Sequence, residues 1–276
     1  MNIKRTFLAV ISACGAFIAS AFTTDTVTVE TTYLERPMRV TVTKPDVAVW
    51  QGVELPTIYL LHGYGGDYKS WTSMVPAIGP LADQYEVIIV MPDGRDSWYF
   101  DSPVNPKVKM ESFFVKDLVP YIDSHYPTAK DASQRAITGL SMGGHGGLYL
   151  GTRHPEIWGN IGSMSGGVNI IPFEKRWKIA AALGEYKTNP TTWEQHTVIN
   201  MVDKMKLNGQ NIIIDCGSED FFHQVNADLH SKLLEAKVPH EYTSRPGKHN
   251  WKYWSNSILY HTMFFSNNFK AAKAKK

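Results

Sequence analysis

Three residue types in this sequence, a serine, an acid and a histidine, could together perform nucleophilic catalysis. The serine lies in the pentapeptide Gly139-Leu140-Ser141-Met142-Gly143, which fits the pattern Gly-x-Ser-x-Gly. In this pattern the glycines allow a sharp turn between a strand and a helix, on which the serine is exposed. A serine hydroxyl is a weak nucleophile at neutral pH and needs a histidine base that a carboxylate orients. The pentapeptide therefore predicts an acid and then a histidine later in the chain.

The acid and the base are expected where later strands end, because ligands in open parallel sheets bind beyond the carboxyl ends of the strands. The apolar run 212–214 is followed by Glu219 and Asp220, and we predict Asp220 as the acid. Glu219 is the alternative, since a shift of one residue in this loop would exchange the two. The last strand-like run is followed by His249, which we predict as the base. His240 lies at the opposite end of that run and is set aside.

Two backbone amides are candidates for stabilising a developing oxyanion. Met142 follows the serine and opens the helix expected after it, so its amide is the first candidate. The second is the amide of Tyr64 in the loop His62-Gly63-Tyr64-Gly65-Gly66, where glycines let the backbone approach a substrate. The sequence contains no His-Glu-x-x-His motif and no paired cysteines, so we expect neither a metal nor another cofactor.

The pattern of apolar residues predicts the elements that carry these side chains. Short apolar runs bounded by glycine or proline are typical of central parallel strands. Such runs cover residues 57–61, 87–91, 135–138, 160–164, 211–216 and 241–244. Helical patterns cover residues 142–153, 225–237 and 251 to about 271. This alternation predicts an α/β fold in which helices flank a mostly parallel central sheet.

Three further stretches modify this plan. Alternating residues from Thr26 to Thr43 predict two half-buried strands joined by a turn at 35–37. Helical spacing from Met110 to Tyr126 predicts a crossover helix, which Pro120 would bend. From Val168 to Lys206 two helical patterns, 173–183 and 192–205, occur with no strand between them. We interpret this stretch as a small helical insertion, either a lid over the active edge or ordinary helical packing.

Residues 1–21 have the features of an export signal. Basic residues precede an apolar run from Phe7 to Phe22, and Ala19-Ser20-Ala21 supplies the small residues that a signal peptidase reads. We predict cleavage near Ala21 and an exported protein, periplasmic or secreted, whose residues 22–276 form a single domain. Lipidation at Cys14 is one alternative. A membrane anchor is another, but the run is shorter than the ~20 apolar residues of a spanning helix, so we expect no stable membrane insertion after cleavage.

Charge and cysteine content disfavour several classes of partner and cross-link. Without Lys4 and Arg5, 26 basic residues balance 26 acidic ones, and no basic stripe suggests a nucleic-acid partner. Loss of Cys14 would leave Cys216 as the one thiol, so we expect no internal disulfide and a buried Cys216. The sequence does not predict an oligomeric state.

Six motifs follow one another over residues 55–265. They are Leu60-Leu61-His62-Gly63-Tyr64-Gly65-Gly66, Met91-Pro92-Asp93-Gly94, Asp117-Leu118-Val119-Pro120-Tyr121-Ile122, Gly139-Leu140-Ser141-Met142-Gly143-Gly144, Gly217-x-x-Asp220 and His249-x-Trp251. In this order and spacing they resemble the esterase D-type family of α/β-hydrolases, which includes feruloyl and acetylxylan esterases, S-formylglutathione hydrolases and mycolyltransferases. The resemblance implies the α/β-hydrolase fold and an acyl-enzyme mechanism. It implies Ser141, Asp220 and His249 as the triad, and the amides of Tyr64 and Met142 as the oxyanion hole.

Within this family the sequence is most similar to the secreted feruloyl and acetylxylan esterases of carbohydrate esterase family 1. The segment Asp93–Tyr99 resembles the loop that borders the acyl pocket in those enzymes, which implies that Trp98 binds substrate. Trp251 is a second candidate, because a flat indole ring can stack on a feruloyl ring or a sugar. Trp254 could act in the same way or lie in the core.

These observations predict an exported serine esterase that removes feruloyl or acetyl groups from plant cell-wall polysaccharide such as xylan. Its partner is then an acyl ester, either small or polymeric. A broad short-chain carboxylesterase and a thioesterase similar to S-formylglutathione hydrolase are alternatives among enzymes. A non-catalytic carbohydrate-binding module on the same fold is the alternative of another class. Such a module would not need a serine, an acid and a histidine in this order.

Overall fold

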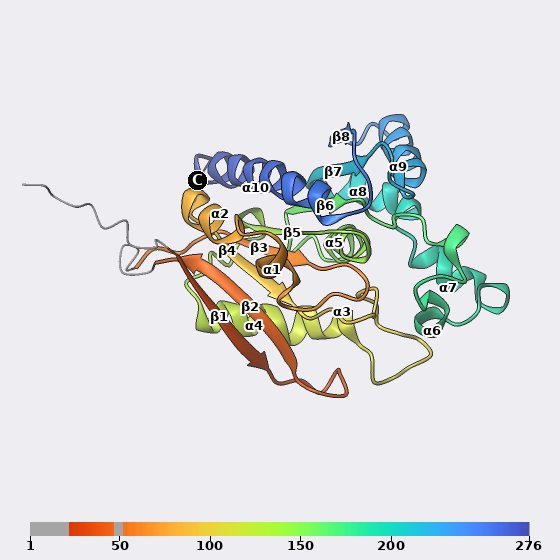
Figure 1. Cartoon of the computed structure of the whole chain (residues 1–276), viewed down its shortest axis with the longest axis horizontal. Coiled ribbons are helices and arrows are strands. Elements are labelled where there is room, and N and C mark those ends of the chain that lie inside the picture. The colour runs from red at the N-terminus through yellow and green to blue at the C-terminus, as the bar shows by residue number, and fades with distance from the viewer. Residues whose placement is uncertain (1–21, 47–51, 276) are drawn as a thin grey trace, which may run out of the picture.

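A computed structural model describes residues 22–46 and 52–275, in which eight strands form one sheet (Figure 1). In chain order the strands are β1 (Phe22–Val29), β2 (Met38–Pro45), β3 (Thr57–Leu61), β4 (Ile88–Pro92), β5 (Arg135–Gly139), β6 (Asn160–Met164), β7 (Asn211–Gly217) and β8 (Glu241–Arg245). Their order across the sheet is β1-β2-β4-β3-β5-β6-β7-β8. β1 and β2 are an antiparallel hairpin, β2 pairs antiparallel with β4, and the other neighbours are parallel. The predicted fold class is confirmed.

The first hairpin is longer than the alternating pattern predicted. β1 begins at Phe22, which pairs with Pro45, rather than at Thr26. The extra residues are mostly exposed on this edge strand, so no hydrophobic alternation marks them. The predicted export signal, its cleavage site and Cys14 lie outside the described residues.

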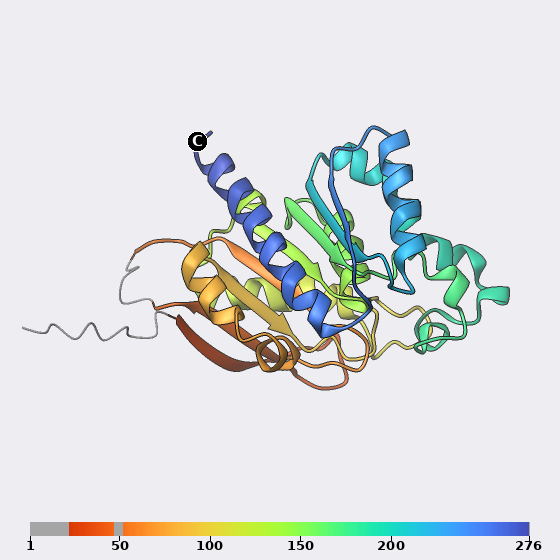
Figure 2. The same ribbon diagram turned by 45° about the horizontal axis from the view of Figure 1, so that its top comes forward.

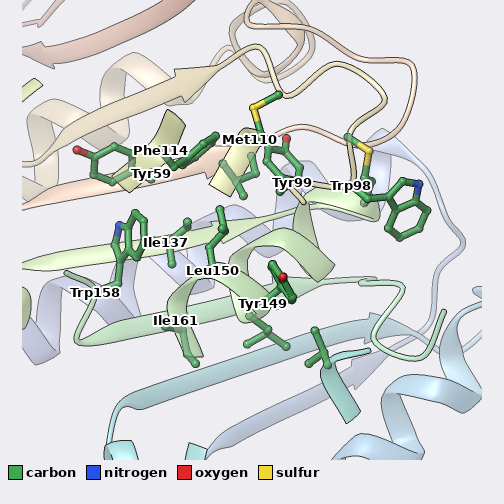
Figure 3. Close-up of a cluster of buried hydrophobic side chains, with 14 of the residues drawn as sticks. Tyr59, Trp98, Tyr99, Met110, Phe114, Ile137, Tyr149, Leu150, Trp158 and Ile161 are labelled. Atoms are coloured by element: carbon green, nitrogen blue, oxygen red, sulfur yellow. The ribbon is translucent and has the colours of Figure 1, made fainter. Parts of the chain in front are cut away.

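Helices cover both faces of the sheet, and alternate strand residues point into two separate cores. In β3, Ile58 belongs to a core closed by α1 (Ser70–Met74), α2 (Ile78–Tyr85) and α10 (Trp251–Lys273). Figure 2 shows α10 lying along this face. Tyr59 belongs to the other core, which α5 (Met142–Arg153) and α9 (His223–Glu235) help to close. Figure 3 shows Tyr59 in that cluster with Ile137 and Leu150.

The predicted crossover helix contains one wide turn. It consists of α3 (Met110–Phe113), a π-helical turn (Phe114–Leu118) and α4 (Val119–His125). Pro120 has no N–H to donate to the preceding turn of the helix, and the π-helical turn directly before it accommodates that loss. The Val119 amide donates to the Phe114 carbonyl. A wide turn thus precedes Pro120, where the sequence predicted a bend.

The insertion between β6 and β7 consists of short pieces, and α6 and α7 extend beyond the end of the sheet (Figure 1). The two predicted helices are wrong in detail, because the structure has α6 (Ile179–Leu183), α7 (Pro190–Gln195) and α8 (Val202–Asn208). The insertion also contains short 3₁₀-helical turns at Ile171–Phe173, Tyr186–Thr188 and Val198–Met201. A further 3₁₀-helical turn, Ala132–Gln134, lies directly before β5. Gly184, with φ +80°, ends α6, and Pro190 is the first residue of α7. Among the described residues, no helix is long and apolar enough to cross a membrane.

Candidate active site

Ser141 lies on the turn between β5 and α5, as the pentapeptide predicted. Its φ of +56° and ψ of −116° form a combination that L-residues rarely adopt. Backbone hydrogen bonds hold this turn: the Ser141 amide donates to Met164 O at 2.9 Å, and the Gly143 amide donates to Leu140 O at 2.7 Å. The strained residue is thus fixed from both sides.

The glycines on either side of Ser141 are required by the neighbouring strand. A Cβ atom added at Gly139 would lie 2.5 Å from the carbonyl oxygen of Leu61. One added at Gly143 would lie 2.5 Å from the same oxygen and 2.6 Å from the carbonyl oxygen of His62. Backbone atoms of β3 cannot move aside as a side chain can. The pattern Gly-x-Ser-x-Gly therefore follows from the close approach of this turn to β3.

Ser141, His249 and Asp220 form one hydrogen-bonded chain. His249 Nε2 lies 2.9 Å from Ser141 Oγ, and His249 Nδ1 lies 2.9 Å from Asp220 Oδ2 and 3.0 Å from Oδ1. A carboxylate can only accept, so Nδ1 carries the hydrogen and Nε2 is free to accept the serine proton. These three side chains come from the ends of β5, β7 and β8, where the parallel strands end together.

Asp220, and not Glu219, is the acid that contacts the imidazole. The Asp220 side chain is fully buried, and its Oδ1 also accepts the amide of Phe222 at 2.8 Å. Glu219 points outward, with its side chain 56% exposed and its carboxylate 3.8 Å from Lys248 Nζ. The choice of Asp220 over Glu219 thus agrees with the geometry.

Two other histidines near the site are buried and have other partners. His145 Nε2 lies 2.9 Å from the carbonyl oxygen of His196, and His261 Nδ1 lies 2.9 Å from Thr138 Oγ1. Burial lowers the pKa of His145 to about 3, and burial lowers the pKa of His261 to about 3 as well. Both rings are therefore neutral at pH 7. Neither makes the contact with the serine that His249 makes.

The two amides predicted for an oxyanion hole both border the serine. Met142 N–H is the first amide of α5, and the first amides of an α-helix have no acceptor within the helix. Tyr64 lies in the glycine-rich loop that lines the cavity together with Ser141. A Cβ atom at Gly63 would be 3.2 Å from that of Ser141, so the loop backbone touches the elbow. The role of these amides stays a prediction.

An open cavity of about 730 Å³ lies in front of Ser141 and His249. Its lining consists of Gly63, Tyr64, Gly65, Gly66, Asp67, Lys69, Ser70, Ser73, Met74, Leu140, Ser141, Trp177, Phe221, His249, Trp251 and Trp254. Trp251 therefore lies in the cavity wall, and its role in substrate binding stays a prediction. Trp254 is largely buried, yet it also lines the cavity and meets the His249 ring edge-on at 4.8 Å.

Trp98 does not line this cavity, which corrects the prediction made for it. Its side chain is 1% exposed, and its indole N–H donates to the carbonyl oxygen of Trp177 at 3.1 Å. Figure 3 shows Trp98 and Tyr99 in the buried cluster. Both residues have positive φ, 54° and 65°, and both side chains belong to the core. Trp98 supports a wall of the cavity from behind.

Two aromatic residues of the cavity were not predicted from the sequence. The Phe221 ring lies 4.2 Å from the His249 ring and stacks on Trp177, at 5.7 Å and an angle of 21°. Phe221 follows Asp220 directly, so its place beside the predicted acid was a usable signal. Trp177 lies in the insertion, where no motif marks it. The insertion thus supplies part of the cavity wall, in addition to packing on the core through Trp193.

Within residues 22–46 and 52–275, no group of three or more His, Cys, Asp or Glu side chains is arranged to hold a metal ion. Cys216 is buried in β7, as predicted, and burial raises the pKa of its thiol. The thiol is therefore protonated at neutral pH and is a poor nucleophile.

Comparison with known proteins identifies the family to which the chain belongs. The family model named Esterase matches residues 31–265, so the chain belongs to this family. It is an esterase with the α/β-hydrolase fold, and the predicted family is confirmed.

Individual proteins similar to this chain are named as esterases or hydrolases. The acetyl esterase of Caldicellulosiruptor saccharolyticus is 28% identical over 232 residues, which cover 79% of this chain and 86% of that protein. A ferulic acid esterase of known structure is 27% identical, with a TM-score of 0.78 and coverage of 90% of this chain and 98% of that one. An S-formylglutathione hydrolase from Staphylococcus aureus also has a TM-score of 0.78, with 89% and 99% covered. At 19% identity, that likeness concerns the fold alone.

Proposed function

We propose that this esterase releases acyl groups from plant cell-wall polysaccharide, with Ser141, His249 and Asp220 as its catalytic triad. The observation that carries the proposal is the chain of 2.9 Å contacts from Ser141 Oγ through His249 to Asp220. It opens onto a cavity of about 730 Å³, so a substrate carbonyl can reach the serine. A hydroxyl paired with an oriented histidine base is the arrangement that acyl transfer requires.

The first half of the reaction acylates the serine. Ser141 Oγ attacks the ester carbonyl carbon while His249 Nε2 takes the hydroxyl proton. Asp220 stabilises the imidazolium that results. The carbonyl oxygen becomes an oxyanion, and the amides of Tyr64 and Met142 donate to it. When the tetrahedral intermediate collapses, the bond to the alcohol breaks and His249 gives its proton to the leaving oxygen.

The second half releases the acid. A water molecule loses a proton to His249 Nε2 and attacks the carbonyl carbon of the acyl-enzyme. The same two amides stabilise the second oxyanion. Collapse breaks the bond to Ser141 Oγ, which regains its proton from His249, and the free carboxylic acid leaves. No external reductant or oxidant is needed, since hydrolysis moves only protons and an acyl group.

The cavity walls support an acyl group or sugar with a flat face. Besides Tyr64, the lining around Ser141 includes the aromatic residues Trp177, Phe221, Trp251 and Trp254. Aromatic rings and sugar faces both stack on such surfaces. The cavity is also far larger than an acetyl group requires. A feruloyl ester therefore fits this site best, and acetyl esters are smaller substrates of the same site.

Another part of the lining is polar and suits the alcohol of a sugar ester. It is formed in and beside α1 by Asp67, Lys69, Ser70 and Ser73. These side chains offer donors and acceptors to sugar hydroxyls. A polymeric substrate also needs an open cleft, and residues 1–21 would direct the protein out of the cell where such polymers are found.

The substrate proposal is tested by measuring kcat/KM of the full chain on methyl ferulate, acetylated xylan and S-formylglutathione side by side. We expect the first two to be hydrolysed and the third to be much slower. A preference for S-formylglutathione would replace the proposed substrate. A folded protein that is inactive on all three would favour the non-catalytic binding module. Ser141→Ala is the control and should lose activity on every ester.

The proposed export is tested separately by fractionating cells that produce the full chain. We expect the protein outside the cytoplasm with Phe22 as its first residue, as N-terminal sequencing would show. A lipidated protein that begins at Cys14 in the membrane fraction would support the lipoprotein alternative. An uncleaved protein in the cytoplasm would contradict export.

A further inference from the structure

The buried imidazole of His62 contacts two backbone segments at the cavity. His62 follows β3 and is 1% exposed. The amide of Gly94 donates to its Nε2 at 2.8 Å, and its Nδ1 lies 2.7 Å from the carbonyl oxygen of Gly63. An amide can only donate and a carbonyl can only accept, so Nε2 carries the lone pair and Nδ1 carries the hydrogen. These two backbone groups thus select one neutral tautomer of His62.

The carbonyl that His62 contacts belongs to the same peptide group as the amide of Tyr64. In a planar trans peptide, the C=O of Gly63 and the N–H of Tyr64 point in opposite directions. The Gly63 oxygen accepts from two donors, His62 Nδ1–H and the amide of Gly66 at 3.0 Å. Fixing this carbonyl therefore fixes the direction of the Tyr64 N–H. Hydrogen bonds to the carbonyl also polarise the peptide group, which makes its N–H a stronger donor.

His62 is itself held rigidly. Its own carbonyl oxygen accepts from the hydroxyl of Tyr99 at 3.0 Å. The Asp93 carboxylate lies 3.7 Å from Nε2, which is too long for a hydrogen bond. The ring therefore has one arrangement that satisfies both of its nitrogens. His62 is absent from the lining of the cavity, whereas Gly63 is part of it, so the hydrogen bond to Gly63 links His62 to the site.

We propose that His62 is a positioning residue that sets the direction and the donor strength of the Tyr64 amide in the oxyanion hole. This inference rests on the proposed function, because it takes the Tyr64 N–H as a donor to the oxyanion. An oxyanion donor acts on the transition state more than on bound substrate. Loss of the His62 contact should therefore lower kcat and leave KM nearly unchanged.

Two substitutions of His62 each keep one of its two hydrogen bonds and remove the other. In His62→Asn, the amide nitrogen of the side chain can occupy the place of Nδ1 and keep the bond to Gly63. In His62→Gln, the longer side chain can place its oxygen near the position of Nε2 and keep the bond to Gly94. Each variant loses one buried hydrogen bond, so their losses of folding stability should be similar. They differ in whether the Gly63–Tyr64 peptide is held.

We expect kcat of His62→Gln to fall about 10- to 100-fold, somewhat less than the loss caused by removing a whole oxyanion donor. The kcat of His62→Asn should be about tenfold higher than that of His62→Gln. KM should change little in both. The inhibition constant of an acyl trifluoromethyl ketone, whose adduct with Ser141 carries an oxyanion, should rise in His62→Gln by the same factor as kcat falls. Equal kcat in the two folded variants, or an unchanged inhibition constant, would overturn the inference.

A measurement on the unmodified protein covers the case in which the variants do not fold. Nitrogen-15 chemical shifts of the His62 ring distinguish the two neutral tautomers. We expect hydrogen on Nδ1, and hydrogen on Nε2 would contradict the proposed contact. Failure of the wider proposal is distinguishable, because Ser141→Ala would then retain hydrolysis or the unmodified protein would hydrolyse none of the esters. Failure of this inference alone would leave an enzyme that depends on Ser141 but not on the identity of residue 62.

Discussion

The elbow around Ser141 and the insertion at 168–206 meet at one cavity but are held by different means. The elbow is fixed by backbone contacts, since Gly139 and Gly143 pack against carbonyl oxygens of the neighbouring strand. The insertion is fixed mainly by side chains. For example, Trp98 donates its indole N–H to the carbonyl of Trp177.

This difference indicates which property of the enzyme depends on each region. A backbone contact fixes one geometry, and a Cβ atom at either elbow glycine would disrupt it. Contacts made by side chains can be exchanged for others while the fold persists. We infer that the elbow sets the rate of the reaction and that the insertion sets the preference among acyl groups.

The largest expected effect concerns the two neighbouring acids. Asp220→Ala should lower kcat/KM by roughly 10⁴-fold, because His249 loses the group that orients it. Glu219→Ala should change kcat/KM by no more than about twofold, since its exposed contact with Lys248 contributes little. Steady-state kinetics on methyl ferulate would measure both. The reverse ranking would assign the acid to Glu219.

One glycine in each region tests how well the backbone there tolerates an added side chain. Gly143→Ala should lower the free energy of unfolding by about 3 kcal/mol, because its Cβ meets two backbone oxygens. Gly184→Ala in the insertion should cost about 2 kcal/mol, because φ 80° with ψ 168° is a region that glycine alone adopts readily. The atoms its Cβ meets belong to the Asn189 side chain, which can move. Urea unfolding measures both. A larger loss at Gly184 would contradict the distinction.

A buried histidine that links the helix after the elbow to the insertion should make folding stability sensitive to acid. The ring of His145 in α5 bonds to the carbonyl of His196 in the insertion, and burial lowers the pKa of His145 to about 3 from an ordinary 6.5. Below pH 6.5 the unfolded chain binds a proton that the folded one does not, so stability falls as pH drops from 6.5 toward 3. Between pH 8 and pH 5 this group should account for about 2 kcal/mol.

His145→Gln should remove that share of the acid sensitivity, and the same change at exposed His125 serves as the control. Free energies of unfolding at the two pH values would measure it. If the slope with pH is the same in His145→Gln as in the unmodified protein, the ring of His145 is not the group responsible.

The smallest expected effect is on selectivity. Trp177→Ala should lower kcat/KM on methyl ferulate by about 3- to 10-fold, the value of one aromatic contact, and should leave a small acetyl ester nearly unaffected. Leu207→Ala, at an exposed position in α8, is the control. Equal losses on both esters would indicate that Trp177 supports the fold of the site and not its preference for aromatic substrates.

The same contrast explains what could be predicted from the sequence. A serine nucleophile requires a particular turn, an acid and a base in a fixed order, so Ser141, Asp220 and His249 could be located from type and spacing. The central strands could be located as well, because burial on both faces leaves continuous apolar runs.

The remaining features depend on packing between distant segments. Trp98 was assigned to the cavity because its loop resembles one that borders a pocket, but its ring lies in the core and donates to the carbonyl of Trp177. Trp177 reaches the cavity through short pieces that have no helical period long enough to recognise. Phe221 could have been noted from its place after Asp220, but its contact with the His249 ring, at 4.2 Å, is seen only in the structure.

The central claim is that Ser141 is the nucleophile, and covalent labelling with a fluorophosphonate tests it most directly. Mass spectrometry of the digested protein should find one phosphonyl adduct, on the peptide that contains Ser141, and Ser141→Ala should be neither labelled nor active. Labelling of another residue, or a Ser141→Ala protein that still hydrolyses the ester, would contradict the account.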